Sequence, residues 1–412
     1  MAFFEHPWAY IYCSFHNPRF FSFKFLQHYI ISCRMTEPEV LCGYTEEVSM
    51  ARFVYISIGG GVACIGCICN LILLYLFTFR QLANSPPQLY PAILAFLDTL
   101  LCFFFLMIFV VDVNMIYNKS EYLFLLFHRY IIMTFCTAKL VQFLIPYLLM
   151  LGTLERYTWI DNKHNKMALL QPKYRPFTLG GLLLGAIMLR VPSAMALTVT
   201  QFPKCADFFR TLAVDVEEWA QESTLYMVYD VYGIACLQTF CPFLCLTVLN
   251  FVIVSKLAKI DAAQCPTKEM KGSPTKRKRS RVLSSLRISK LQITSTVRNA
   301  IYTMVAIVST YLISNSLHIL LTLLEVTKSS VLVDEHDPYK ASLLYTLLGD
   351  AVSLLYMVSS AVRILIYTYC NPAIRYQLFS FLGLRYDRKD SDQSKIIIAS
   401  PLLIEGQLSN SV

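Results

Sequence analysis

Three consecutive residues, Glu155, Arg156 and Tyr157, stand at the end of a long apolar stretch that covers 131–155. An acid beside a base, where a buried helix meets water, can form an ion pair that protonation or a competing partner opens. The chemistry that this triplet offers is the making and breaking of an ion pair. We expect Arg156 to be the residue that changes partner.

Other ionisable residues lie inside apolar stretches, namely Asp98, Lys139, Arg190 and Arg363. A charge in an apolar environment is costly unless it has a partner or faces a polar cavity. We therefore expect these side chains to point into the interior of the protein and to mark its functional regions.

The sequence offers no set of residues for covalent or metal chemistry. Cys64, Cys67 and Cys69 lie close together, but no histidine or carboxylate stands near them to complete a metal site. No candidate nucleophile and general base stand at matching positions in the apolar stretches, where they could meet. We expect no enzyme activity, no cofactor and no metal ion.

The composition indicates the elements that must position these residues. Hydrophobic residues make up 56% of the 412 residues and charged residues only 15%, which is more apolar surface than a soluble domain buries. A membrane-spanning helix needs about 20 mostly apolar residues. Seven windows qualify and predict an all-α membrane protein, a seven-transmembrane helix bundle: 54–79, 87–111, 131–155, 177–200, 225–255, 299–324 and 342–368.

The lysines and arginines predict the orientation, because cytoplasmic loops retain cations. The segments after the first, third, fifth and seventh windows hold 23 of the 36, and the opposite segments hold 10. We predict a plasma-membrane protein with an extracellular N-terminus and a cytoplasmic C-terminus. The net charge of +9 reflects this asymmetry and not nucleic-acid binding.

The windows also divide the chain. The predicted parts are an extracellular N-terminal segment (1–52), the seven-helix domain (53–369), a short amphipathic eighth helix (370–383) and a cytoplasmic tail (384–412). Pro372 fits the first turn of that short helix. Met35 could equally be a start codon, which leaves open whether residues 1–34 belong to the mature protein.

Two features of the extracellular side concern covalent modification. Asn118 begins the sequon Asn-Lys-Ser after the second window and is a predicted glycosylation site. Cys136 and Cys205 are the best cysteine pair for a disulfide in an oxidising compartment. Cys13, Cys33 and Cys42 compete for Cys205.

The third cytoplasmic loop, 256–298, is strongly basic. It holds twelve lysines and arginines, among them 276–279, interleaved with serines. Runs of this kind attract anionic lipid and are substrates for basophilic kinases. We expect kinases and arrestin to act on this loop and on the tail.

The order of several short signatures resembles the rhodopsin-like (class A) family of G-protein-coupled receptors, from about Ile56 to Phe381. Each signature lies in the helix and at the depth that the family pattern requires. The matching residues are Cys69-Asn70, Leu94-Ala95-Phe96-Leu97-Asp98, Glu155-Arg156-Tyr157, Pro242 with Leu249-Asn250, and Tyr367.

Three departures from the family pattern change the expected chemistry. Asn315 stands where the family has an aromatic toggle, and Ile131 stands where its helix-three cysteine belongs. Arg363 and Ile364 replace the Asn-Pro that precedes Tyr367. Members of the family often hold a sodium ion at the position of Asp98, and we expect Arg363 to replace that ion by pairing with Asp98.

The sixth and seventh windows resemble those of invertebrate FMRFamide-type neuropeptide receptors, including nematode ones. This resemblance implies an extracellular, amidated peptide as ligand, whose cation would meet Glu325 or Asp350. Lys139 could instead pair with Asp350 or accept a carboxylate. The candidate ligand-binding residues are Lys139, Gln142, Phe143, Asn315, His318, Glu325, Tyr345 and Asp350.

The resemblance also implies signalling through heterotrimeric G proteins by opening of the cytoplasmic end of the bundle. Arg156 would pair with Glu155 at rest and meet the G protein when released. Tyr157, Asn250 and Tyr367 would share this coupling role, whereas Asn70 and Pro242 would be structural.

Two other classes stay open. The predicted extracellular segments are acidic, with Glu217, Glu218 and Glu222 among their residues. An orphan chemosensory seven-helix receptor for a small molecule would share the fold but would not need this acidic face. A membrane transporter is a remote alternative, because its repeats would place glycine or proline interruptions symmetrically. Gly59-Gly60-Gly61 and Gly180-Gly181 are not placed in that way.

Overall fold

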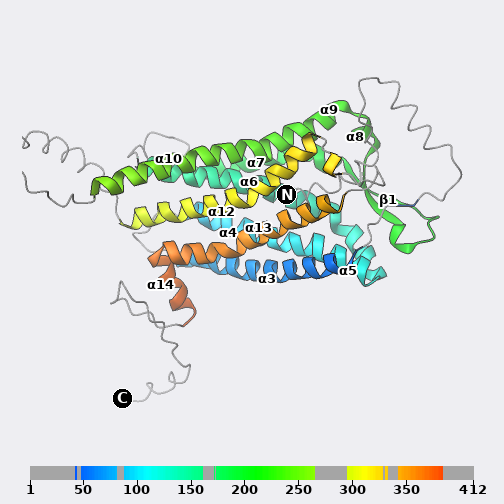
Figure 1. Ribbon diagram of the computed structural model, residues 1–412, viewed down its shortest axis with the longest axis horizontal. Coiled ribbons are helices and arrows are strands. Elements are labelled where there is room, and N and C mark those ends of the chain that lie inside the picture. The colour runs from blue at the N-terminus through cyan, green and yellow to red at the C-terminus, as the bar shows by residue number, and fades with distance from the viewer. Residues whose placement is uncertain are drawn as a thin grey trace, which may run out of the picture.

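The computed structural model describes residues 42–43, 48–80, 88–160, 171, 173–264, 295–327, 330–332 and 342–383. Within these ranges, seven helices are long and apolar enough to cross a membrane. They run side by side along the long axis of the molecule (Figure 1). The predicted all-α architecture with seven spanning helices is confirmed at this level, and it indicates a multi-pass membrane protein.

The second and fifth spans are composite helices, each containing wide π turns. In chain order the spans are α3 (Met50–Phe79); α4 (Leu89–Phe105) with η2 (Leu106–Val110) and α5 (Val111–Tyr117); α6 (Glu121–Ile160); α7 (Arg175–Met195); α9 (Thr224–Met227) with η5 (Val228–Ile234), η6 (Cys236–Phe240) and α10 (Cys241–Gln264); α12 (Ser295–Val326); and α13 (Leu343–Cys370). Helix α14 (Pro372–Phe381) follows.

Local sequence signals set several helix ends. The hydroxyls of Ser49 and Ser342 accept hydrogen bonds from backbone N–H groups in the first turns of α3 and α13, each at 3.2 Å. Asn371 caps α14 in the same way at 3.1 Å. Pro372 follows as the first residue of α14, where its missing N–H costs nothing.

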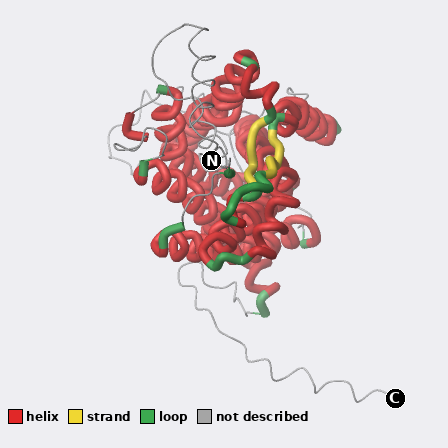
Figure 2. The backbone as a smooth tube through the Cα atoms, turned by 90° about the vertical axis from the view of Figure 1, so that its right-hand side faces the viewer, coloured by secondary structure: helices red, strands yellow, loops and turns green. Residues whose placement is uncertain are grey.

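A β-hairpin follows α7, although the sequence predicted helix as far as residue 200. Strands β1 (Leu197–Gln201) and β2 (Leu212–Val216) pair antiparallel, with Leu197 opposite Val216. The prediction of helix there was wrong, because the β-branched run of residues 198–200 is apolar but favours a strand. Between and after the strands lie η4 (Phe208–Arg210) and α8 (Glu218–Glu222). The hairpin lies over the helix ends in Figure 2.

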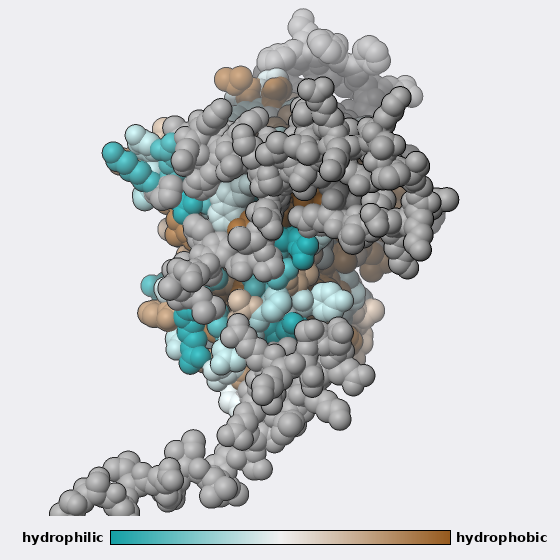
Figure 3. Space-filling model, turned by 90° about the vertical axis from the view of Figure 1, so that its left-hand side faces the viewer, coloured by the Kyte–Doolittle hydropathy of each residue, from teal (hydrophilic) through white to brown (hydrophobic). Residues whose placement is uncertain are grey.

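We call the end of the bundle that carries β1 and β2 the hairpin end, and the opposite end the α14 end. The two are separated by the length of the spanning helices (Figure 1). Hydrophilic side chains gather on the α14 end, which faces the viewer in Figure 3. Helix α14 folds back toward α3, since the Gln377 side chain donates to the Arg80 carbonyl at 2.6 Å.

Apolar side chains from all parts of the bundle form the core between the helices. Phe105, Leu149, Leu246 and Ile307 are among its most deeply buried members. Where α3 meets α4, Gly66 lies so close that a Cβ atom there would sit 2.9 Å from the Cys102 sulfur.

Several predicted segments fall outside the described residues. These are most of the N-terminal segment, the tail beyond residue 383 and residues 265–294, which include the basic run 276–279. Helix α10 continues to Gln264 and α12 begins at Ser295, so the third loop is shorter at both ends than predicted.

Candidate functional site

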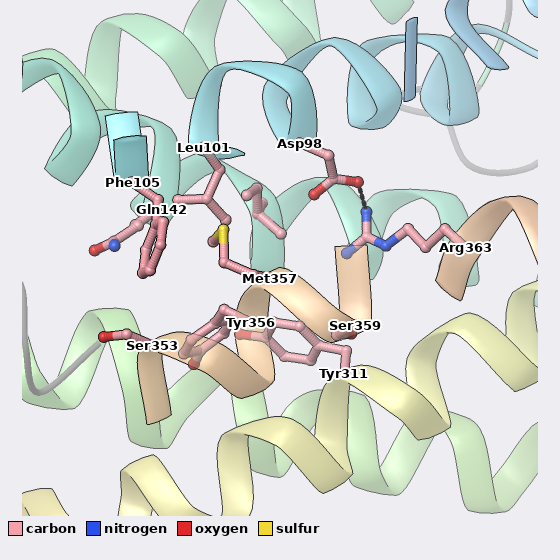
Figure 4. A pocket seen from close by; sticks show the side chains of 11 residues that line it. Asp98, Leu101, Phe105, Gln142, Tyr311, Ser353, Tyr356, Met357, Ser359 and Arg363 are labelled. Carbon is pink, nitrogen blue, oxygen red and sulfur yellow. Dashed lines mark hydrogen bonds and ion pairs between the residues drawn. The ribbon is translucent and has the colours of Figure 1, made fainter. Parts of the chain in front are cut away.

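Two opposite charges meet inside the bundle. The guanidinium of Arg363 on α13 donates to the carboxylate of Asp98 on α4 (Figure 4). Their side chains are only 5% and 1% exposed. The pairing that the sequence predicted for these two residues is present. It places a neutralised ion pair, and not an isolated charge, in the core.

A small cavity lies beside this ion pair. The volume open to the centre of a water molecule is about 20 Å³. By this measure, roughly 10–15 Å³ is enough to hold one water molecule. Figure 4 shows Gln142 and Ser353 toward one end and the ion pair at the other. Within the described part of the chain, Gln142 Oε1, Ser353 Oγ and Arg363 Nε make no hydrogen bond. The cavity is therefore polar enough to hold water.

The amide of Asn70 joins α3 to α13 near the ion pair. Its nitrogen donates at 2.9 Å to the Gly66 carbonyl and at 2.9 Å to the Ser360 hydroxyl. Ser360 also lies 3.5 Å from the Cys102 sulfur on α4. Asn70 thus joins α3 to α13, and Ser360 extends this polar contact to α4, which fits the structural role predicted for Asn70.

Asn315 forms a polar contact between α12 and α13. Its Oδ1 accepts a hydrogen bond from the Tyr356 hydroxyl, and its nitrogen donates to the Tyr311 carbonyl at 2.8 Å. Tyr311 and Tyr356 both line the cavity. Asn315 is therefore linked to the cavity that Asp98 and Arg363 border.

Pro242 is the second residue of α10, which begins directly after the π turn η6. A proline has no N–H to donate to the carbonyl four residues earlier, and its ring crowds that carbonyl. The preceding turn widens, and this places Gln238 and Thr239 in the core, 1% and 3% exposed. The Tyr147 hydroxyl of α6 donates at 2.8 Å to the Leu237 carbonyl in the same turn.

At the α14 end, each residue of the triplet in α6 has a different described contact. Glu155, fully buried, accepts from Arg175 of α7. The Arg156 guanidinium lies 4.2 Å from the centre of the Trp159 ring. Lys256 of α10 donates to the Tyr157 hydroxyl at 2.9 Å. Arg175 is a partner for Glu155 that the sequence did not predict. The resting pair of Arg156 with Glu155 stays a prediction.

The other two predicted coupling residues also lie at this end. Asn250 of α10 donates to the Ser309 hydroxyl of α12 at 3.0 Å. Tyr367 of α13 is buried, with its ring 5.0 Å from that of Phe77 on α3. The five residues predicted to take part in coupling therefore lie toward one end but contact different helices.

The predicted disulfide between Cys136 and Cys205 is wrong. Cys205 bonds to Cys42, whereas Cys136 is a free, half-buried thiol in α6. The hairpin meets α6 near its start, where Phe208 and Phe209 contact Phe124, twelve residues before Cys136, and Arg210 holds Gly43 beside it. Gly43 N–H donates to the Arg210 carbonyl at 2.9 Å, and Arg210 Nε donates to the Gly43 carbonyl at 2.8 Å.

Both acids of the predicted ligand-binding set have partners within the chain. Asp350 lies 3.5 Å from Arg52 of α3, which the sequence did not predict as its partner. Glu325 accepts from the Tyr345 hydroxyl at 2.8 Å. These contacts lie between helices near the hairpin end, and no sequence signal indicated that Arg52 would take part.

The remaining predicted ligand-binding residues lie deeper. Lys139 is buried, with its ammonium group 5.1 Å from the Phe135 ring centre. Phe143 stacks on Tyr147 at 4.9 Å, and His318 is fully buried on α12. Gln142 reaches the cavity. Of the predicted set, the structure brings Gln142 and Asn315 to the cavity region, whereas Glu325 and Tyr345 form a separate pair.

Asn118 is exposed in the connection between α5 and α6, at the hairpin end. Its amide donates to Asn114 at 3.2 Å. Glycosylation there stays a prediction.

No protein-family model and no curated protein matches this sequence. The resemblance to rhodopsin-like receptors therefore rests on the residues themselves.

Proposed function

We propose that this chain is a seven-helix receptor of the rhodopsin-like type, with the ligand at the hairpin end and a heterotrimeric G protein at the α14 end. The observation that supports this most is the arrangement around the triplet in α6. Glu155 contacts α7 and Tyr157 contacts α10, while Arg156 lies between them, 4% exposed. Opening of that end would break both interhelical contacts and expose the guanidinium.

A ligand changes such an equilibrium only if it binds one packing of the helices better than the other. The polar contacts between Asp98 and Arg363 and between Asn315 and Tyr356 lie between the two ends. Both join α13 to other helices, so a ligand that shifts α13 would alter them. This gives a physical route from the hairpin end to Arg156.

In this proposal the hairpin end is extracellular and the α14 end cytoplasmic, in the plasma membrane. Asn118 then lies where it could be glycosylated, and α14 lies where an amphipathic helix could rest on the inner membrane surface. The loop between α10 and α12 would meet kinases and arrestin. As part of this proposal, the chain keeps the domain limits predicted from the sequence and acts as a receptor without enzyme activity.

An amidated, FMRFamide-like neuropeptide is the first candidate ligand, on the resemblance alone. A small molecule sensed by an orphan chemosensory receptor is the second. The engaged state of Asp350 and Glu325 means that a ligand cation would have to compete with Arg52 or Tyr345 there.

The test is expression of the chain in cells with a promiscuous G-protein reporter and a panel of amidated peptides. Arg156→Ala should abolish the response at unchanged surface expression, because the guanidinium is the proposed G-protein contact. Glu325→Gln should weaken it. Arg129→Ala removes an exposed cation of the same helix and should leave the response intact. Silence toward every peptide despite surface expression would favour the small-molecule candidate.

A further inference from the structure

The described contacts around the end of α6 bring three basic side chains to one acid. Glu155 is fully buried and accepts from Arg175 of α7. Lys256 of α10 donates to the Tyr157 hydroxyl at 2.9 Å. Arg156 itself is 4% exposed. Because Arg175 already neutralises the one carboxylate of this group, Arg156 and Lys256 add positive charge that a further source of negative potential would stabilise.

Helix α12 brings no carboxylate to this end of the bundle. Ile301 of α12 belongs to the same apolar cluster as Ile160 of α6 and Ile253 of α10, so the three helices pack together here. The sequence contains no aspartate or glutamate between Glu269 and Glu325. Glu325 lies in the last turn of α12, near the hairpin end. Arg156 therefore gains no ion pair from α12.

Aromatic rings supply negative potential to both cations. The Arg156 guanidinium lies 4.2 Å from the centre of the Trp159 ring, and the Lys256 ammonium group lies 4.2 Å from the centre of the Tyr157 ring. The face of an aromatic ring attracts a cation within about 6 Å of its centre. The attraction is strongest for tryptophan and grows when the cation is withdrawn from water. Trp159 is therefore a substantial partner for the buried Arg156 guanidinium.

The contact between Arg156 and Trp159 belongs to α6 alone. Residues three positions apart lie on the same face of a helix, so the ring reaches the guanidinium without help from α7 or α10. Trp159 is partly exposed and lies next to Ile160, the last residue of α6. The Arg156 side chain can therefore leave the ring by rotating about its own bonds, while the helix stays intact. Trp159 need not be the only partner of Arg156 for this to hold.

We propose that Trp159 is a positioning residue, which holds the Arg156 guanidinium in its resting direction and thereby limits signalling without ligand. The inference rests on the proposed function, because it concerns the regulation of the same G-protein contact. A bound G protein competes with the Trp159 ring for the guanidinium. A weaker attraction by the ring therefore shifts the side chain toward the direction in which it meets the G protein.

The test changes the electron density of the ring and keeps its shape. Trp159 is replaced with mono-, di- and trifluorotryptophan by suppression of a stop codon. Each fluorine withdraws electrons from the face of the ring and weakens its attraction for a cation. Ligand-free nucleotide exchange on a panel of reconstituted heterotrimeric G proteins should rise with each fluorine.

Ordinary variants and a matched control accompany the series. Trp159→Leu should raise ligand-free exchange severalfold, and Trp159→Phe, which keeps a ring, should raise it less. The same fluorine series at Trp219, which is 48% exposed in α8, should leave exchange unchanged. If Trp159→Leu fails to fold, the fluorinated forms still decide, because they keep the size of the ring.

A second readout reports the contact itself, with or without a responding G protein. The thermal unfolding midpoint of the purified full chain should fall with each fluorine at Trp159, since the folded state loses attraction between the ring and the guanidinium. In the Arg156→Met background the series should leave the midpoint unchanged, as a double-mutant cycle requires of a pair that interacts. An equal effect in both backgrounds would show that the ring only fills space, and this would overturn the proposal.

The outcomes separate this inference from the proposed function. If exchange depends on Arg156 but stays flat or falls along the fluorine series, the receptor function stands and the positioning role of Trp159 is overturned. If the midpoints fall step by step but neither the parent nor any variant drives exchange on any G protein, the contact is only structural, and the proposed function and the positioning role both fail. A stepwise rise in exchange with a stepwise fall in the midpoints supports both.

Discussion

Arg363 of α13 donates to Asp98 of α4 in the middle of the bundle, where both side chains are almost fully buried. Each residue alone would be a strongly unfavourable charge in this environment. Together they recover part of the desolvation cost and fix the packing of α13 against α4. The pair also borders the cavity that Gln142 and Ser353 line. The stability of the bundle and the polarity of its centre therefore depend on the same two residues.

Removal of either charge alone should destabilise the protein strongly. Breaking a buried pair from one side typically costs about 3–5 kcal/mol, because the remaining charge has no partner. We expect Asp98→Asn and Arg363→Met each to lower the thermal unfolding midpoint, and the double variant to regain most of the loss. A double-mutant cycle on the purified protein measures the coupling. Additive losses would show that the contact contributes little.

The same pair should make the protein insensitive to sodium. A guanidinium beside Asp98 occupies the space and supplies the charge that a cation would otherwise provide. The melting temperature of the parent should be equal in sodium chloride and in choline chloride at matched ionic strength. Arg363→Asn should become more stable in sodium. An equal sodium effect in the parent and in this variant would contradict the prediction, and Asp98→Asn/Arg363→Asn serves as the control without a carboxylate.

The sequence predicts what depends on local composition and helix periodicity. Seven apolar windows became seven helices that are long and apolar enough to span a membrane. The pairing of Asp98 with Arg363 could be predicted because a charged residue in an apolar stretch is costly unless it has a partner of opposite charge.

Contacts that depend on the path of a connection were not predictable in this way. From the sequence, Cys205 could pair with any of several cysteines. Its pairing with Cys42 depends on the path of the hairpin, which the sequence did not predict. Arg175 and Arg52 looked like ordinary charges near helix ends, and the packing of α7 and α3 turns them toward Glu155 and Asp350.

The disulfide gives a prediction about the hairpin end. Cys42→Ser and Cys205→Ser should each lower the thermal stability, because the bond closes a long segment of chain and such bonds typically contribute about 2–4 kcal/mol. Cys136→Ser should change little, since this cysteine is a free thiol. Peptide mapping without reduction should recover Cys42 joined to Cys205. Recovery of Cys136 joined to Cys205 would refute the observed pairing.

Two glycines of α3 form a matched pair for testing helix packing. A Cβ at Gly66 would sit 2.9 Å from the Cys102 sulfur, whereas a Cβ at Gly61 would meet nothing within 4 Å. Gly66→Ala should therefore destabilise the protein, and overpacking of this kind typically costs about 1–3 kcal/mol. Gly61→Ala should be neutral or slightly stabilising, because alanine favours helix. Thermal unfolding of the two variants side by side measures the difference, and equal midpoints would contradict close packing of α3 on α4.

The contact between Glu155 and Arg175 gives the last prediction, which concerns signalling without ligand. In the proposed mechanism this ion pair holds α6 against α7 while the α14 end is closed. Arg175→Leu removes an ion-pair partner of a fully buried carboxylate, and the closed packing should lose more stability than the open one, in which water reaches Glu155. We expect a several-fold rise in ligand-free nucleotide exchange on a reconstituted G protein. Lys173→Leu removes an exposed cation two residues away and should leave basal exchange unchanged. If Arg175→Leu is properly folded and its basal exchange equals that of Lys173→Leu, the ion pair stabilises the fold without restraining activation.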